Sequence, residues 1–101
     1  MKYQKIYDML RRHPGIYTHD HSGMPYYPLW IVVELPYNGL RIWITHDDRQ
    51  YGISTANAKL DCSTREYSES FQHYSFSRQR DLVEKLQQLI ARRKDTGHVA
   101  A

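Results

Sequence analysis

Two histidine-containing stretches hold the side chains of this chain that could bind a metal ion. Residues 19–21 read His-Asp-His, which places two imidazoles on one side of an extended chain, and residues 46–48 read His-Asp-Asp, which could add carboxylates. A catalytic zinc site needs three protein ligands and one open position. The spacing fixes no third ligand, and Asp in loops commonly forms turns. His19, His21 and His46 are therefore weak metal candidates, and the sequence predicts no cofactor.

Motifs for covalent or nucleotide chemistry are missing from the sequence. The single cysteine, Cys62, matches neither a papain-type nor a phosphatase-type cysteine loop, and the carboxylate of Asp61 beside it opposes thiolate formation. The five glycines are too dispersed for a phosphate-binding loop, and neither a nucleophile elbow nor an HExxH pattern occurs. The sequence thus predicts no catalytic residue and a non-enzymatic protein. A His/Asp metal-dependent enzyme is the second alternative.

The composition points to a cytoplasmic protein. One cysteine excludes an intrachain disulfide and suits a reducing compartment. No apolar run approaches the roughly 18 residues of a membrane-spanning helix. The first five residues, Met-Lys-Tyr-Gln-Lys, have no apolar stretch behind them, so we expect no secretory signal.

Positive charge is concentrated toward the two ends of the sequence. Residues 1–15 carry four basic and one acidic side chain, and residues 77–101 carry six basic and three acidic ones, whereas residues 16–76 carry four and seven. A nucleic-acid-binding alternative uses three residues of the last segment, spaced by seven: Arg78, Lys85 and Arg92. On a helix these side chains lie nearly above one another and could follow a row of phosphates. A solvated helix face explains them equally well, because Asp81 lies four residues before Lys85.

Tyrosine is the most abundant aromatic residue, with nine copies against two phenylalanines and two tryptophans. A buried phenol needs a hydrogen-bond partner, so tyrosine suits half-buried positions of the kind common at protein interfaces. Four tyrosines fall before the first expected strand of the sheet or beside its hairpin turn: Tyr17, Tyr26, Tyr27 and Tyr37. Together with Trp43 and Arg41, these are the predicted partner-binding residues.

Apolar spacing predicts one helix at each end of the chain. Apolar side chains recur at i, i+3, i+4 and i+7 from Tyr3 to Leu10, which predicts a helix over residues 1–12. A second stripe runs from Leu82 to Ile90 and predicts a helix over residues 77–96, ended by Gly97 and followed by a frayed tail over 97–101. The stretch 13–28 contains several prolines and glycines, so we expect a loop.

Between these helices the sequence predicts an antiparallel meander over residues 29–54. Asn38-Gly39, between two runs of β-formers, is a strong signal for a two-residue hairpin turn. This turn would place Tyr37 opposite Leu40, and it would place Leu35 opposite Ile42. A third strand would follow from residue 50. Residues 55–76 are expected to be irregular or to add a fourth strand near 72–76.

The hairpin has two different faces. One face is mainly aliphatic and is the predicted core: Ile31, Val33, Leu35, Ile42 and Ile44, with Tyr37 and Leu40 beside the turn and Tyr51 and Ile53 from the third strand. The other face is mixed: Trp30, Val32, Glu34, Arg41, Trp43 and Thr45. If both helices cover the aliphatic face, the mixed face is exposed and is typical of an interaction site. If one helix covers each face, the tryptophans belong to the core, and the sequence leaves both arrangements open.

The sequence therefore predicts one α+β domain over residues 1–101, in which two helices pack on an antiparallel sheet of three to four strands. Its expected function is non-enzymatic binding of a protein partner or self-association, as a protein-interaction or inhibitor module. Small cofactor-free domains of this kind include inhibitors made by bacteria or their phages, among them inhibitors of host defence. Nucleic-acid binding through the terminal helices is the alternative.

Overall fold

A computed structural model describes residues 2–23, 25, 27–37, 39–47 and 49–100, with side chains as far as Ala91. The elements, in chain order, are α1 (Gln4–Arg11), β1 (Tyr17–Asp20), β2 (Leu29–Leu35), β3 (Leu40–His46), β4 (Tyr51–Asn57), α2 (Arg65–Glu69), β5 (Gln72–Phe76) and α3 (Gln79–Ala100). The predicted α+β class, with a helix at each end of a sheet, is confirmed. The sheet has five strands instead of three or four, and a short additional helix, α2, precedes the last strand.

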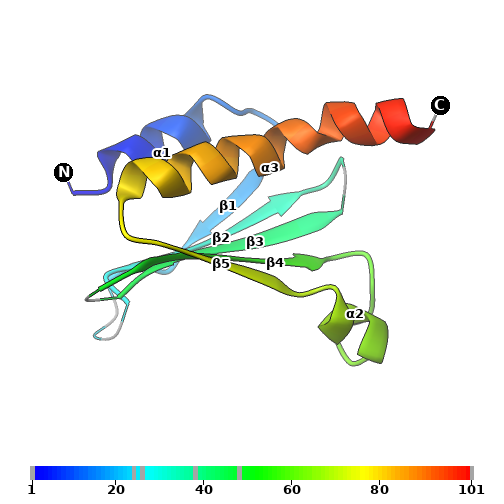
Figure 1. Cartoon of the computed structure of the whole chain (residues 1–101), viewed down its shortest axis with the longest axis horizontal. Coiled ribbons are helices and arrows are strands. Elements are labelled where there is room, and N and C mark those ends of the chain that lie inside the picture. Colours follow the sequence, from blue (N-terminus) through cyan, green and yellow to red (C-terminus); the bar gives the residue numbers. More distant parts are fainter. Residues whose placement is uncertain (1, 24, 26, 38, 48, 101) are drawn as a thin grey trace.

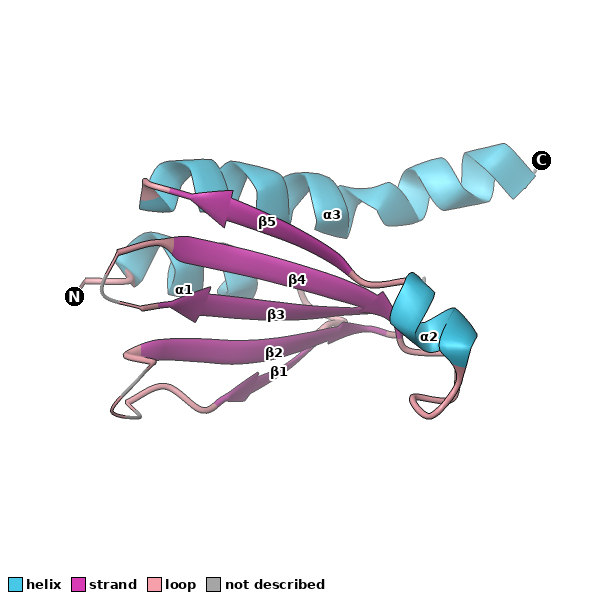
Figure 2. Cartoon of the chain, turned by 60° about the horizontal axis from the view of Figure 1, so that its bottom comes forward, coloured by secondary structure: helices cyan, strands magenta, loops and turns pink. Residues whose placement is uncertain are grey.

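All five strands lie in one antiparallel sheet in the order β1-β2-β3-β4-β5. α1 and α3 lie side by side on one face of this sheet, and α2 lies on the other side near one end (Figures 1 and 2). The two long helices, α1 and α3, therefore form a layer on one face of the sheet, and the short α2 covers only one end of the other face. Among the residues that the structure describes, no helix combines the length and the apolar character needed to cross a membrane.

The core lies between α1, α3 and the aliphatic face of the sheet. Along β2 every second side chain is buried, from Leu29 to Leu35, as expected for a strand with one covered face. The helices contribute buried side chains at helical spacing: Ile6, Met9 and Leu10 from α1, and Leu82, Leu86, Leu89 and Ile90 from α3. Seven of the nine predicted core positions of the sheet are buried, and the other two, Tyr37 and Leu40 beside the loop, are partly buried and pack against the core.

The predicted hairpin register is wrong by two residues. Leu35 pairs with Leu40 and Val33 pairs with Ile42, so four residues instead of two separate the paired ends of β2 and β3. The N–H of Gly39, which has a φ of +70°, donates to the carbonyl of Leu35 at 2.9 Å. Because side chains alternate with a period of two, a slip of two residues leaves the same side chains on each face.

Three other boundaries differ from the predictions. The stretch 13–28, expected to be a loop, contains β1, whose four residues are all exposed and lack the alternation that reveals a half-buried strand. Residues 55–57 continue β4 instead of leaving the sheet. α3 begins two residues later than expected and continues through Gly97 to Ala100, so Gly97 does not end it. The predicted strand at residues 72–76 is confirmed as β5.

Candidate partner-binding face

The face of the sheet opposite α1 and α3, called here the open face, is the candidate functional site. Its side chains come from alternate positions of all five strands: Tyr17 and His19; Trp30, Val32 and Glu34; Arg41, Trp43 and Thr45; Gly52, Ser54 and Ala56; His73 and Ser75. Figure 2 turns this face toward the viewer, with the two long helices behind the sheet. Of the two arrangements that the sequence allowed, the structure has both long helices on the aliphatic face.

Aromatic rings gather on the open face. The ring of Trp43 stacks on Phe71 with 5.3 Å between centroids, and the ring of Trp30 lies 5.7 Å from that of Tyr27. Among the described residues, three large hydrophobic side chains are strongly exposed: Tyr17 at 62%, Phe71 at 45% and Tyr27 at 41%. All three lie on this face or against its tryptophans. We call these five residues the aromatic patch.

α2 places Phe71 in the aromatic patch. The helix begins after Thr64, whose hydroxyl accepts the N–H of Tyr67 at 3.2 Å and so satisfies one donor of the first turn. Tyr67 is 7% exposed, and its ring makes an edge-on contact with Phe71 at 5.3 Å. The buried Tyr67 ring therefore anchors α2 to the sheet. Phe71 comes four residues later in the chain, and its ring stacks on Trp43.

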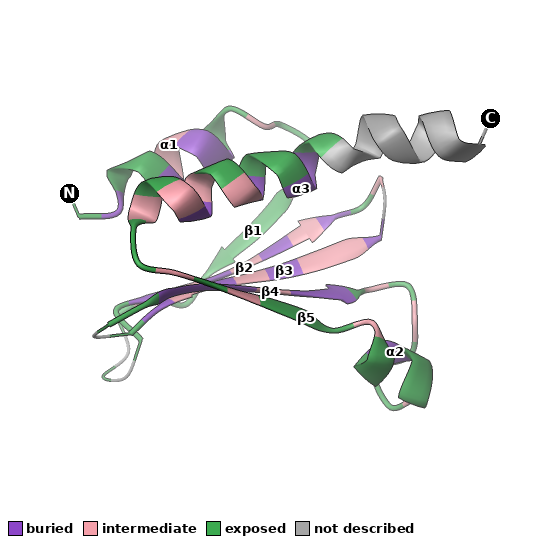
Figure 3. Cartoon of the chain, in the orientation of Figure 1, coloured by how far each residue is buried: buried purple, intermediate pink, exposed green. Residues whose placement is uncertain are grey.

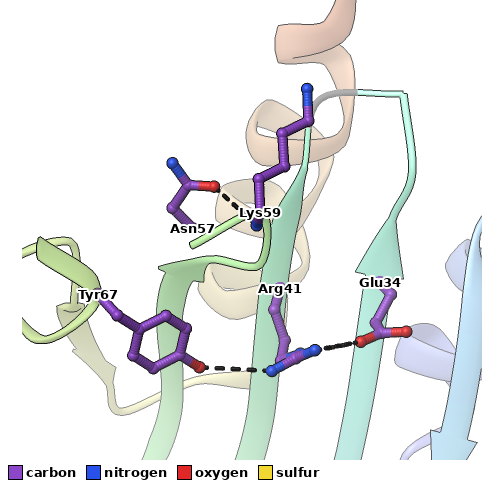
Figure 4. Close-up of polar contacts among 5 residues, drawn as sticks. All are labelled: Glu34, Arg41, Asn57, Lys59 and Tyr67. Carbon is purple, nitrogen blue, oxygen red and sulfur yellow. Dashed lines mark hydrogen bonds and ion pairs between the residues drawn. The ribbon is translucent and has the colours of Figure 1, made fainter. Parts of the chain in front are cut away.

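Arg41 connects the strands of the open face to α2 (Figure 4). Its Nε and Nη2 donate to Oε1 of Glu34 at 2.9 and 2.7 Å, and its Nη1 donates to the hydroxyl of Tyr67 at 3.4 Å. The guanidinium carbon also lies 6.0 Å from the ring of Trp43. The hydrogen bond that Arg41 donates to Glu34 is the main cause that raises the pKa of Arg41. Arg41 and Glu34 are the charged residues among the open-face positions, so their charges cancel within one ion pair.

A cavity of about 300 Å³ lies at the loop end of the open face, beside Arg41. Tyr17 and Glu34 line one side of it, and Lys59 lines the other. The side chain of Lys59 passes over the backbone of Gly39, where an added Cβ would meet its carbons at 2.7–2.8 Å. The flexible Lys59 side chain can move away from such a Cβ at little cost, so the positive φ is the main reason that glycine is favoured at position 39.

The structure separates the predicted partner-binding residues. Tyr17, Arg41 and Trp43 lie on the open face, and Tyr27 lies against Trp30 at its border. Tyr37 lies on the helix side instead, where it packs on the core with its hydroxyl 3.5 Å from the carbonyl oxygen of Ile90. Tyr26 lies outside the described residues. Phe71 was missed, because it contacts Trp43 from a segment 28 residues away and no local pattern marks it.

The three histidines considered for metal binding lie apart. His19 is exposed on the open face, and the ring of His21 lies 5.7 Å from that of Trp30. His46 is buried on the opposite face, where its Nδ1 is hydrogen-bonded to the hydroxyl of Tyr3 at 2.7 Å. Within the described part of the chain, no group of three His, Cys, Asp or Glu side chains is arranged to hold a metal ion.

The basic residues considered for nucleic-acid binding differ in their surroundings. Arg78 is exposed just before α3. Lys85 is partly buried, and its Nζ lies 4.2 Å from the centroid of the Tyr74 ring, so its charge faces β5. The side chain of Arg92 lies outside the described residues. Arg78 is exposed but Lys85 is partly buried, so these two described residues do not form a line of fully exposed cations.

Asp20 lies at the end of β1, on the helix side of the sheet. Its Oδ2 accepts the hydroxyl of Tyr7 at 2.7 Å, and its Oδ1 accepts the N–H of Ser22 at 2.9 Å. Burial alone would raise the pKa of the Asp20 carboxyl, but the hydrogen bonds from Ser22 and Tyr7 outweigh burial and lower it below 3.8. The ionised carboxylate thus ties β1 to α1.

This depressed pKa predicts a loss of stability in acid. A carboxyl whose pKa is lower in the folded state contributes stability above its unfolded pKa, and that contribution is lost as the pH falls through the folded pKa. We expect Asp20→Asn to be less stable than the wild type at about pH 6 and the difference to shrink by about pH 2.5. Urea unfolding of both proteins at each pH measures this difference. A difference that is the same at both values would contradict the role of the ionised carboxylate.

Comparison with known proteins assigns no function to this fold. The open face and its aromatic patch are therefore interpreted from their own geometry. No protein-family model, curated protein sequence or solved structure matches the chain.

Proposed function

We propose that this chain is a small non-enzymatic binding protein that uses its open face to bind a protein partner, as a protein-interaction or inhibitor module. The observation that carries the proposal is the aromatic patch. Its three strongly exposed rings are large apolar side chains of the kind that folded proteins usually bury. They are grouped on the face of the sheet that the long helices leave uncovered. Aromatic side chains in such patches supply most of the binding energy at many protein interfaces.

The charge of the open face favours a protein over a nucleic acid. Its Arg41 is paired with Glu34, so the face offers little net charge to phosphates. Among the side chains that the structure describes, six exposed basic ones lie on or beside the two long helices: Lys2, Lys5, Arg11, Arg12, Arg78 and Arg80. A nucleic acid would be attracted to those helices and not to the aromatic patch, because the affinity of a protein for a nucleic acid depends on how many phosphates its basic side chains neutralise.

An inhibitor role belongs to the same proposal. A protein of this size can block a larger partner by covering one functional surface, and a face built from five strands offers a broad, rigid surface for that purpose. Inhibition of a bacterial defence protein, by a product of a bacterium or a phage, is the specific form that we put forward.

Capture experiments with matched aromatic variants test this proposal. The immobilised protein is exposed to a lysate of the organism that encodes it, with and without nuclease, and retained proteins are identified by mass spectrometry. We expect Trp43→Ala to weaken binding of the purified partner by at least about tenfold, because it removes the central ring of the patch. Tyr37→Ala is the matched control: it removes a partly buried ring from the helix side and should change the affinity by less than about twofold.

The same experiment can contradict the proposal. Equal affinity of the wild type and Trp43→Ala, with both variants shown to be folded by circular dichroism, would exclude the open face. If the retained material disappears with nuclease and its binding weakens steeply with salt, the nucleic-acid alternative holds instead. Charge removal at Arg78 and Lys85 should then reduce the salt dependence.

A further inference from the structure

β1 leaves one edge of the sheet without a neighbouring strand. It is the first strand in the sheet order and pairs with β2 alone. The N–H of His21 donates to the carbonyl of Trp30 at 2.7 Å, and in an antiparallel ladder the residues that bond to the partner strand alternate. His19 therefore bonds toward β2, and the backbone N–H and C=O groups of Thr18 and Asp20 point outward. Figure 3 shows that β1 is exposed along its whole length.

A cavity of about 320 Å³ opens beside this edge, between α1 and β1. We call it the α1–β1 cavity. Its apolar lining includes Leu10 and Ile31, which are buried, and Ile16, which is partly buried. Its polar lining includes Thr18 and Asp20, whose side chains face the helix side of the sheet. A strand added outside β1 would therefore direct every second side chain toward this cavity.

We propose that this edge is a strand-addition site. It takes an extended segment of a protein partner, with a bulky apolar side chain in the α1–β1 cavity and an acidic side chain facing Arg11. Main-chain hydrogen bonds to Thr18 and Asp20 supply the sequence-independent part of the affinity, and the cavity supplies the specificity. This site uses residues outside the aromatic patch, so it goes beyond the proposed function of the open face.

The lining of the cavity determines the chemistry of the segment. Ligand pockets measure roughly 300–1,000 Å³, so this cavity lies at the small end of that range and has room for one large side chain. Its lining includes the carboxylate of Asp20, which already accepts hydrogen bonds from Tyr7 and Ser22, and the cation Arg11. The side chain of Arg11 is 70% exposed and its Nη1 lies 3.8 Å from Asp8, so it keeps donors for an incoming carboxylate. The segment is thus both apolar and acidic.

Selection from a phage-displayed library of random dodecapeptides tests the proposal, followed by fluorescence anisotropy of the enriched peptides as labelled synthetic probes. We expect the enriched peptides to combine a bulky apolar residue with a nearby acid. Thr18→Pro removes an outward N–H that the fold does not use, and proline is tolerated at such edge positions. It should weaken peptide binding by at least about tenfold, because it removes one main-chain bond and obstructs the edge.

Three further variants keep the test decisive. Thr18→Val retains the N–H and should change the affinity by less than about twofold. Ile16→Trp leaves the backbone edge intact but fills the cavity, so it should weaken the binding of peptides that carry the apolar anchor. This variant tests the cavity even if Thr18→Pro does not fold. Arg11→Glu should remove the preference for acidic peptides over their alanine versions. Thermal melts establish which variants are folded.

Several outcomes would overturn the proposal. One is a library that yields no enriched peptide, and another is a set of peptides that bind Thr18→Pro and Ile16→Trp as tightly as the wild type. A third is a wild-type dimer in sedimentation velocity that Thr18→Pro converts to a monomer, because the edge would then pair with a second copy of this chain and not with a peptide.

Discussion

Replacing Leu86 by alanine is expected to lower the free energy of unfolding by about 3 kcal/mol, because the change leaves a cavity where α3 meets the sheet. Leu86 is 0% exposed and lies between Leu82 and Leu89 in the buried stripe of α3. The buried cluster that contains Leu86 also includes side chains from α1, β2, β3 and β4, so a cavity there cannot close without moving several elements. For a chain of this length the loss corresponds to a decrease in Tm of about 15 °C, measured by circular dichroism.

Gln87→Ala is the matched control for this prediction. Gln87 is the next residue of the same helix and is exposed, so its replacement should change the free energy of unfolding by less than about 0.5 kcal/mol. A loss below about 1 kcal/mol for Leu86→Ala would show that α3 does not pack on the sheet as described.

Tyr67→Ala is expected to release α2 from the open face and to cost about 3 kcal/mol, because a large buried ring is removed. Tyr67 supports Phe71 by ring contact and accepts a hydrogen bond from Arg41. α2 has only five residues, which is too short for a helix to persist without tertiary contacts. Amide hydrogen exchange should therefore accelerate most over residues 65–71, and urea unfolding should report the lost stability.

Tyr67→Phe separates the ring from its hydroxyl. This change removes one hydrogen bond, whose donor Nη1 of Arg41 lies 3.4 Å away, and should cost about 0.5 kcal/mol. Because Tyr67 supports Phe71, Tyr67→Ala should also weaken binding at the aromatic patch, whereas Tyr67→Phe should not. Unchanged exchange over residues 65–71 in Tyr67→Ala would contradict the anchoring role of the ring.

The parts of the fold that the sequence predicts are those with strong periodicity. The alternation from Leu29 to Leu35 and the stripe from Leu82 to Ile90 each correspond to one buried face, so burial alone identifies them. β1 has no buried residue, and only its pairing with β2 defines it. The hairpin register depends on loop conformation as well as on the Asn-Gly signal, and here the N–H of Gly39 reaches back to Leu35.

The candidate site was only partly predictable, for a related reason. The sequence placed Trp43 and Arg41 on the mixed face, since strand alternation determines the face of each residue. It could not decide which face the helices cover, because the apolar stripe of a helix can pack on the aliphatic face or on the tryptophans of the mixed face, and strand alternation does not distinguish these two arrangements. It also gave Tyr37 two roles, as a core-facing residue opposite Leu40 and as a partner-binding residue, because proximity to the hairpin in sequence does not specify on which side of the sheet a loop side chain lies.

The loop between β2 and β3 limits which insertions and deletions this protein can accept during evolution or engineering. Adding or removing two residues there would move the pairing by one full repeat of the pleat and keep Trp43 and Ile44 on their present sides. A change of a single residue that neither the loop nor a bulge absorbs would exchange the two sides of the residues that follow in β3 and turn Trp43 toward the core. Length changes in this loop that shift the strand register should therefore occur in even steps.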